Sequence, residues 1–166
     1  MKAAVLTKLG AADANPLSIR DIPTPIVEPG FALLKVLACG ICRTDLQIIE
    51  GHLPPKGPCI IPGHEIVAEV VQSPQKRLSA GMRVGVSWVV GTDGTWRFCR
   101  ADRENLCDPP VYTHHDAYAE YELLKIAAAL HLRPEVDTYR LDQVNAALRA
   151  QEADQLNHTA VLLPQA

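Results

Sequence analysis

Short apolar runs, most of them rich in valine, alternate with turn residues along the first half of the chain. Runs of this length and composition are typical of β-strands. Prolines and glycines, 13 and 10 in the whole chain, separate them. The predicted strands lie at residues 2–9, 16–23, 29–40, 64–73 and 82–91. This alternation of short apolar runs with turn residues favours a β-barrel or sandwich over a helical bundle.

Two stretches have helical periodicity instead. Residues 42–50 follow Gly40 and end at Gly51, which predicts a helix with a glycine stop. Residues 138–153 predict a second helix, because its apolar residues recur at helical spacing. These residues are Leu141, Val144, Ala147 and Leu148. A last apolar run, residues 158–164, predicts a closing strand, so the expected fold class is mainly β with a few helices, α+β.

Glycine is absent from the second part of the sequence, since the last one is Gly94. The earlier glycines form neither G-x-G-x-x-G nor a Walker A loop. A tight βα turn needs such glycines to bring the backbone close to a pyrophosphate. The alternating βαβα pattern is missing as well. We therefore expect no nucleotide-binding unit, and no Rossmann domain, in this chain.

Composition and charge narrow the class of protein. With 166 residues, 48% hydrophobic and 21% charged, the chain fits one folded soluble domain. Its net charge of −3 argues against nucleic acid or an acidic membrane as partner. No apolar run approaches the ~20 residues that span a bilayer, and the N-terminus does not resemble a signal peptide. We expect a cytoplasmic protein whose five cysteines are thiols or metal ligands.

Cys42 is followed 22 residues later by His64 and then by Glu65. Thiolate, imidazole and carboxylate are the donors that zinc prefers. Cys39 and Cys42 also form a Cys-x-x-Cys pair, which could be a redox pair, half of a zinc knuckle or two unrelated thiols. A buried thiol and a loop histidine would be the plainer interpretation, and these residues alone leave it open.

Four segments in this order resemble the zinc-dependent alcohol dehydrogenases of the medium-chain dehydrogenase family. They read ACGICRTDL, IPGHEIV, AGMRVGVSWVVGTDGTWRFCRADRENLCD and AYAEY, and the match extends over residues 1–121. Residues 130–163 resemble the C-terminal end of the same family. The resemblance implies a GroES-like catalytic domain, a partly open β-barrel.

In that family a Rossmann cofactor domain lies between the AYAEY segment and the C-terminal region that residues 130–163 resemble. Here the sequence passes from one to the other directly, so the cofactor domain looks excised near residues 121–124. We expect residues 1–121 to form the N-terminal part of the catalytic domain and residues 122–166 to complete it. Residues 122–129 would be a remnant of the last helix of the lost domain.

The resemblance also implies roles for individual residues. Cys42 and His64 match two of three protein ligands of the catalytic zinc, and the third, usually a cysteine, falls in the excised part. Glu65 matches a glutamate that becomes a ligand in some members. Asp45 matches a carboxylate that orients the zinc-bound imidazole. Thr44 matches the hydroxyl that takes the alcohol proton.

Other positions near the motif match less well or have structural roles. Arg43 matches a residue that contacts the cofactor's phosphates. Gln47 stands where many relatives place a proton-relay histidine, and we interpret His52 as a solvated loop residue. Cys39 is expected to be a small buried hydrophobe. Cys59 has no assigned role.

A second metal site of the family is degenerate here. Relatives often hold a structural zinc with four cysteines, whereas this chain has Asp93, Trp96, Cys99 and Cys107 at those positions. Tryptophan offers a metal no lone pair. Three donors do not close a tetrahedral site, so we expect an empty lobe, although His114 or His115 could substitute.

The family reaction is oxidation of an alcohol to an aldehyde or ketone, with zinc as Lewis acid and NAD(P) as hydride acceptor. Without a dinucleotide domain we expect no NAD(P) binding and no turnover by this chain alone. Three hypotheses about the function stay open. The protein could be a truncated dehydrogenase with a partial zinc site, an enzyme completed in trans by a cofactor-binding chain, or a zinc-binding or interaction module. We also expect a homodimer and a small alcohol or aldehyde ligand, with no nucleic acid or membrane partner.

Overall fold

The computed structural model describes residues 1–29, 31–54, 60–76, 78–92, 94–101, 103, 106, 111–112, 121–124 and 136–165. Within these residues the protein is mainly β, with two α-helices and open sheets in place of a closed barrel. The expected fold class is confirmed, and no doubly wound parallel sheet occurs in the described residues.

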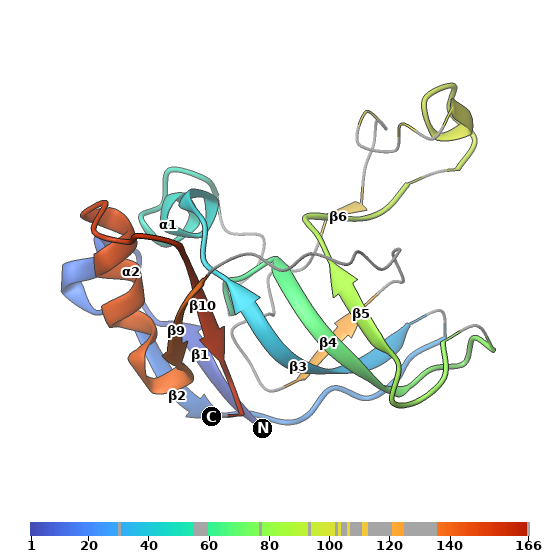
Figure 1. The fold of residues 1–166 in the computed structure, drawn as a ribbon, viewed down its shortest axis with the longest axis horizontal. Helices are drawn as coiled ribbons and strands as arrows, with labels where there is room; N and C mark the ends of the chain where they lie inside the picture. Colours follow the sequence, from blue (N-terminus) through green and yellow to red (C-terminus); the bar gives the residue numbers. More distant parts are fainter. Residues whose placement is uncertain are drawn as a thin grey trace.

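One six-stranded sheet forms the centre of the molecule (Figure 1). Its order is β5–β4–β3–β10–β9, and β8 pairs with the other part of β3. The strands are β3 (Ala32–Gly40), β4 (Glu65–Gln72), β5 (Arg83–Val86), β8 (Tyr121–Leu124), β9 (Val136–Arg140) and β10 (Thr159–Leu163). All pairs are antiparallel except β9 with β10. The C-terminal strand thus joins the same sheet as the strand that leads into Cys42.

A second, two-stranded sheet lies beside the C-terminal helix. β1 (Lys2–Leu6) pairs with β2 (Leu17–Asp21), and the 3₁₀ turn η1 (Ala12–Ala14) connects them. The two chain ends are close, because Lys2 and Gln165 line one groove of about 330 Å³.

Two helices cover one end of the sheet, α1 (Arg43–Ile49) and α2 (Val144–Glu152). Each turns an apolar face to the core, and their buried residues join one cluster. In α2 the side chain of Asn145 holds both polar groups of Leu17, donating to its carbonyl at 2.8 Å and accepting from its N–H at 3.3 Å. Residues 128 positions apart are thereby fixed to each other.

A lobe extends from the body beyond β5 (Figure 1). It begins with β6 (Val89–Gly91), which pairs with β7 (Val111–Tyr112), and contains the 3₁₀ turn η2 (Cys99–Ala101). The sequence predicted one strand over residues 82–91, but the chain leaves the sheet at Ser87 and Trp88. The prediction was wrong there because a continuous apolar run does not reveal a change of sheet.

Two helix predictions also need correction. Residues 138–140 belong to β9 and residues 141–143 to a 3₁₀ turn, so the second α-helix begins only at Val144. Its four predicted core residues are buried as expected. Residues 122–124, predicted as part of a remnant helix, lie in β8, while residues 125–129 are outside the described part of the chain.

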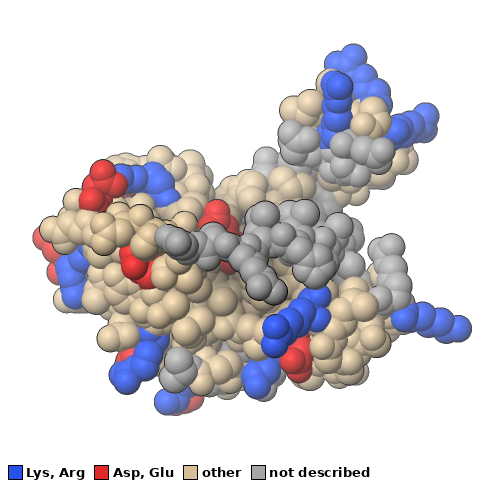
Figure 2. Space-filling model, viewed as in Figure 1, with Lys and Arg blue, Asp and Glu red and all other residues tan. Residues whose placement is uncertain are grey.

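Charged side chains of both signs are spread over the face of the body shown in Figure 2. Among the helices that the structure describes, none has the length and apolar character needed to cross a membrane.

Candidate metal centre

The first turn of α1 is organised around Cys42, the residue that caps the helix. Its Sγ accepts a hydrogen bond from the N–H of Thr44 at 3.3 Å. In return, the Asp45 carboxylate accepts from the N–H of Cys42 at 2.9 Å. This reciprocal arrangement is a capping box in which a cysteine takes the place of serine or threonine. It fixes the position of the sulfur relative to the helix.

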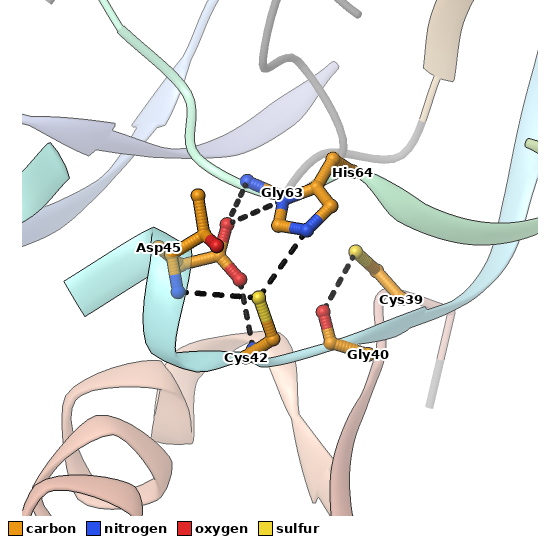
Figure 3. A network of polar contacts seen from close by, with 7 residues as sticks. Cys39, Gly40, Cys42, Asp45, Gly63 and His64 are labelled. Carbon is orange, nitrogen blue, oxygen red and sulfur yellow. Dashed lines mark hydrogen bonds and ion pairs between the residues drawn. The ribbon is translucent and has the colours of Figure 1, made fainter. Parts of the chain in front are cut away.

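Asp45 also reaches the turn that leads into β4 (Figure 3). Its Oδ1 accepts from the N–H of Gly63 at 3.2 Å and lies 3.1 Å from Nδ1 of His64. The carboxylate is fully buried, and His64 is 4% exposed. Because a carboxylate only accepts, Nδ1 carries the proton. This leaves Nε2 as the nitrogen available to a ligand.

Nε2 of His64 points at the sulfur of Cys42, and the two atoms are 3.2 Å apart. The Trp88 ring packs against the imidazole in a T-shaped contact, with ring centroids 4.9 Å apart. Asp45 and Trp88 together restrict the ring orientation.

Glu65, the first residue of β4, completes the group. It pairs with Gly40 of β3, and its side chain lies over that glycine. A Cβ at position 40 would be 2.6 Å from Oε2 of Glu65, so the absence of a side chain there makes room for the carboxylate. One ligand atom each of Cys42, His64 and Glu65 lies within 4.8 Å of the others.

The surroundings of His64 raise the pKa of its imidazole. Burial lowers the pKa of His64, but the hydrogen bonds to Asp45 and Cys42 outweigh burial and raise the pKa to about 10. In the metal-free protein the imidazole is therefore protonated at neutral pH. A metal at Nε2 would have to displace that proton.

The donor set fits a zinc ion with an open position. Thiolate, imidazole and carboxylate from three residues match catalytic zinc sites, which keep the fourth position for water or substrate. Asp45 would supply the carboxylate that metal-bound histidines usually need on their second nitrogen. Glu65 is exposed, so the group opens to solvent on that side.

The other residues singled out in the sequence lie in different surroundings. Thr44 is partly buried, whereas Arg43 and Gln47 are exposed on α1. The side chain of His52 is 72% exposed and pairs with Glu50 at 3.2 Å, in agreement with a solvated loop residue. Cys39 is fully buried, as expected, and its thiol donates to the Gly40 carbonyl at 3.4 Å.

The lobe beyond β5 carries the positions of the family's structural zinc site, and the structure describes two of them, Trp96 and Cys99. Cys99 is buried at the start of η2, and the Trp96 ring packs against Phe98 at 5.0 Å between centroids. Asp93, Cys107, His114 and His115, and also Cys59, lie outside the described residues. The prediction of an empty lobe stays a prediction.

Sequence reasoning missed Trp88. No short spacing connects it to His64, and the contact depends on the register of β4 with β5, in which Ile66 faces Val86. In the sequence, Trp88 was visible only as an aromatic residue within the predicted strand over residues 82–91.

Comparison with known proteins gives one consistent picture. The family described as Alcohol dehydrogenase GroES-like domain matches residues 28–134. The probable alcohol dehydrogenase AdhA of Mycobacterium tuberculosis (strain CDC 1551 / Oshkosh) is 38% identical over 142 residues, which are 80% of this chain and 41% of that protein. This chain spans about two fifths of the length of that relative.

Solved structures agree. The alcohol dehydrogenase of Aeropyrum pernix superposes with a TM-score of 0.64 at 25% identity, over 80% of this chain and 40% of that one. A protein of Sinorhizobium meliloti 1021, assigned as a zinc-binding dehydrogenase and solved with NADP, has a TM-score of 0.58 at 32% identity, over 74% and 35% of the two chains.

Proposed function

This chain belongs to the alcohol dehydrogenase GroES-like domain family, and from that premise we propose that it is a zinc-binding module of the alcohol dehydrogenase kind with no dehydrogenase turnover of its own. The ligands would be Cys42, His64 and Glu65. The observation that carries this proposal is the convergence of their ligand atoms within 4.8 Å, with Asp45 already bonded to the imidazole.

The roles of the chain's own residues follow from their contacts. The capping box holds the Cys42 sulfur at the start of α1, and Asp45 keeps the proton of His64 on Nδ1. Glu65 can reach the group because Gly40 has no side chain. Thr44 would take up the proton of a bound alcohol, and Arg43 would face the phosphates of a cofactor, as their counterparts do in the family.

When bound, zinc would act as a Lewis acid that polarises an alcohol or aldehyde oxygen. Hydride transfer needs an acceptor held beside the substrate, and such positioning contributes ~7–11 kcal/mol to lowering a barrier. The glycine loop that binds a dinucleotide is absent from this sequence. We therefore propose that NAD(P) does not bind to this chain, and that the family's cofactor domain is missing near residues 121–124, between residues 1–121 and the segment 122–166.

One observation supports the proposed place of the missing domain. β9 and β10, which come after residues 121–124 in the chain, lie in the same sheet as β3 and β8. We also propose a cytoplasmic location, where cysteines serve as thiols or metal ligands.

Elemental analysis tests the metal assignment. We expect about one zinc per chain in the wild type and strong loss in Cys42→Ser, while Cys39→Ala, a core thiol near the same helix, keeps its zinc. Equal zinc in all three proteins would remove the assignment. The zinc-loaded chain should not reduce NAD⁺ or NADP⁺ with simple alcohols. Activity that appears only after a dinucleotide-binding protein is added would support completion in trans.

A further inference from the structure

We infer that the lobe beyond β5 holds its fold without a metal, and that packing of Trp96 with Phe98 and Arg97 takes the place of the structural zinc that the family resemblance implies. The lobe projects away from the central sheet (Figure 1). None of these three residues belongs to the proposed zinc site at Cys42, so the inference does not depend on the proposed function.

The donors in the lobe do not fit a structural zinc ion. The four ligand positions of the family correspond here to Asp93, Trp96, Cys99 and Cys107. A closed structural site needs four donors, and the indole of tryptophan offers an N–H but no lone pair. Among the residues that the structure describes, the group able to hold a metal is Cys42, His64 and Glu65, which lies outside the lobe.

At the second of these positions, the tryptophan side chain is packed against its neighbours. The ring centroids of Trp96 and Phe98 are 5.0 Å apart and the ring planes are inclined by 72°, which makes an edge-to-face pair. The guanidinium carbon of Arg97 lies 4.5 Å from the ring centroid of Phe98 and 5.9 Å from that of Trp96. A cation at these distances is attracted by aromatic rings. The side chain that stands in place of a ligand is therefore part of a stack of three residues.

The backbone of the same segment is closed by its own hydrogen bonds. The N–H of Arg100 donates to the carbonyl of Trp96 at 3.0 Å. The carbonyl of Phe98 accepts from the N–H of Arg103 at 2.9 Å. Cys99, which a structural zinc would use as a ligand, is buried at the start of η2. Contacts within the chain thus order this turn, whereas a loop that depends on zinc loses its order when the metal is removed.

Limited trypsin digestion of the full chain tests the lobe, because three exposed arginines lie within it, at positions 97, 100 and 103. Cleavage needs local opening of the segment, so its rate reports how ordered the lobe is. The digests use Cys42→Ser, which lacks the proposed zinc site, after chelation and after loading with zinc. We expect the cleavage rates in the lobe to agree within about twofold. Faster cleavage after metal removal would overturn the inference.

A substitution at Trp96 tests the stack itself. Trp96→Ala should speed cleavage in the lobe by about tenfold or more, because the stack loses one of its two rings. Trp96→Phe keeps an aromatic ring beside Phe98 and Arg97, so it should stay close to the wild type. Cleavage after Arg149, which is exposed on α2, serves as the reference in every digest. A lobe in Trp96→Ala that is cut no faster than in the wild type, relative to this reference, would overturn the inference.

Zinc content gives a measurement that does not require Cys42→Ser to fold. Cys99→Ser should carry as much zinc per chain as the wild type, whether or not the proposed site at Cys42 is filled. A lower content in Cys99→Ser would assign a metal to the lobe and overturn the inference. Absence of zinc from both proteins would support a metal-free lobe and contradict only the proposed function.

Discussion

Asp45 is the residue on which the geometry of the centre depends most. It accepts from two backbone N–H groups and from the His64 ring while fully buried. Asp45→Asn keeps its size but loses the charge, and its amide cannot accept from all three donors. We expect zinc affinity to fall about 10–100-fold, the usual effect of losing the partner of a metal-bound histidine. Competition titration with a zinc chelator measures this.

Asp142→Asn is a suitable control, because Asp142 is exposed and pairs only with Arg140 within the contacts described for it. Its zinc affinity should match that of the wild type. An equal loss in both variants would mean that the Asp45 effect is a general one of charge.

The raised pKa of His64 predicts how zinc binding depends on pH. The imidazole pKa is about 10 in the metal-free protein, so at neutral pH zinc must displace its proton. Apparent affinity should therefore rise with pH between 6.5 and 8.5, with about one log unit per pH unit from this group alone. Calorimetry in buffers of different ionisation enthalpy would count the released protons. A pH-independent affinity in the wild type would contradict this assignment.

The residue-scale features differed in how far the sequence revealed them. Cys42, His64 and Glu65 could be proposed because donor type and motif spacing are local properties. The role of Asp45 as partner of the imidazole came from the family resemblance, and its capping role was not predicted, although it lies only three residues after Cys42. Trp88 could not be assigned, because its contact with His64 is created by strand register and a change of sheet.

At the scale of elements, β3 lies close to β4, and the lack of a side chain at Gly40 of β3 leaves room for the exposed Glu65 of β4. Gly40→Ala would place a Cβ 2.6 Å from Oε2 and 3.3 Å from Cβ of Glu65, and the carboxylate has to move away. If Glu65 is a ligand, zinc affinity should fall roughly tenfold, or about 1.4 kcal/mol. Glu65→Gln should have an effect in the same direction. Unchanged affinity in both would remove Glu65 from the ligand set.

The attachment of α2 to β2 gives a stability prediction. Asn145→Ala removes two hydrogen bonds and leaves both backbone groups of Leu17 without their partner in a partly buried place. We expect a loss of about 1–3 kcal/mol in the free energy of unfolding. Urea unfolding measures this, with the exposed Asn157→Ala as control. A loss below about 0.5 kcal/mol would mean that water replaces the two hydrogen bonds between Asn145 and Leu17.

Element predictions were wrong where long-range pairing decided the conformation. Residues 138–140 continue a helical pattern but form parallel bridges with β10, and residues 122–124 pair with β3. Neither strand pairing can be predicted from residues nearby in the sequence. By contrast, α1 stops just before Gly51, as predicted, and the φ of 83° at Gly51 favours glycine.

The whole molecule combines segments from both ends of the chain. β10 and β9 continue the sheet of β3, and α2 fixes β2, so the C-terminal segment contributes to the fold that holds Cys42. Composition and motif order were sufficient to predict the mainly β fold class. They could not predict the order of strands, because strand order depends on packing between residues far apart in sequence.

Exposed apolar residues on this sheet lead to a prediction about assembly. Val67 and Val71 share the outward face of β4 and are 49% and 41% exposed, and Met82, also 41% exposed, precedes β5. Such a patch favours association, most simply a symmetric dimer. Light scattering over a range of concentrations should show a shift from monomer to dimer. Val67→Lys should weaken association by about tenfold or more, because one valine side chain per chain would no longer be buried.

The control for this experiment is Ile26→Lys, a change at a residue that is 84% exposed in the segment before β3. It adds the same charge elsewhere, so it separates loss of the patch from general repulsion between chains. If Ile26→Lys weakens the dimer as much as Val67→Lys does, the face of β4 is not the interface. A monomer at every concentration would contradict self-association altogether, and the exposed valines would then be ordinary surface residues.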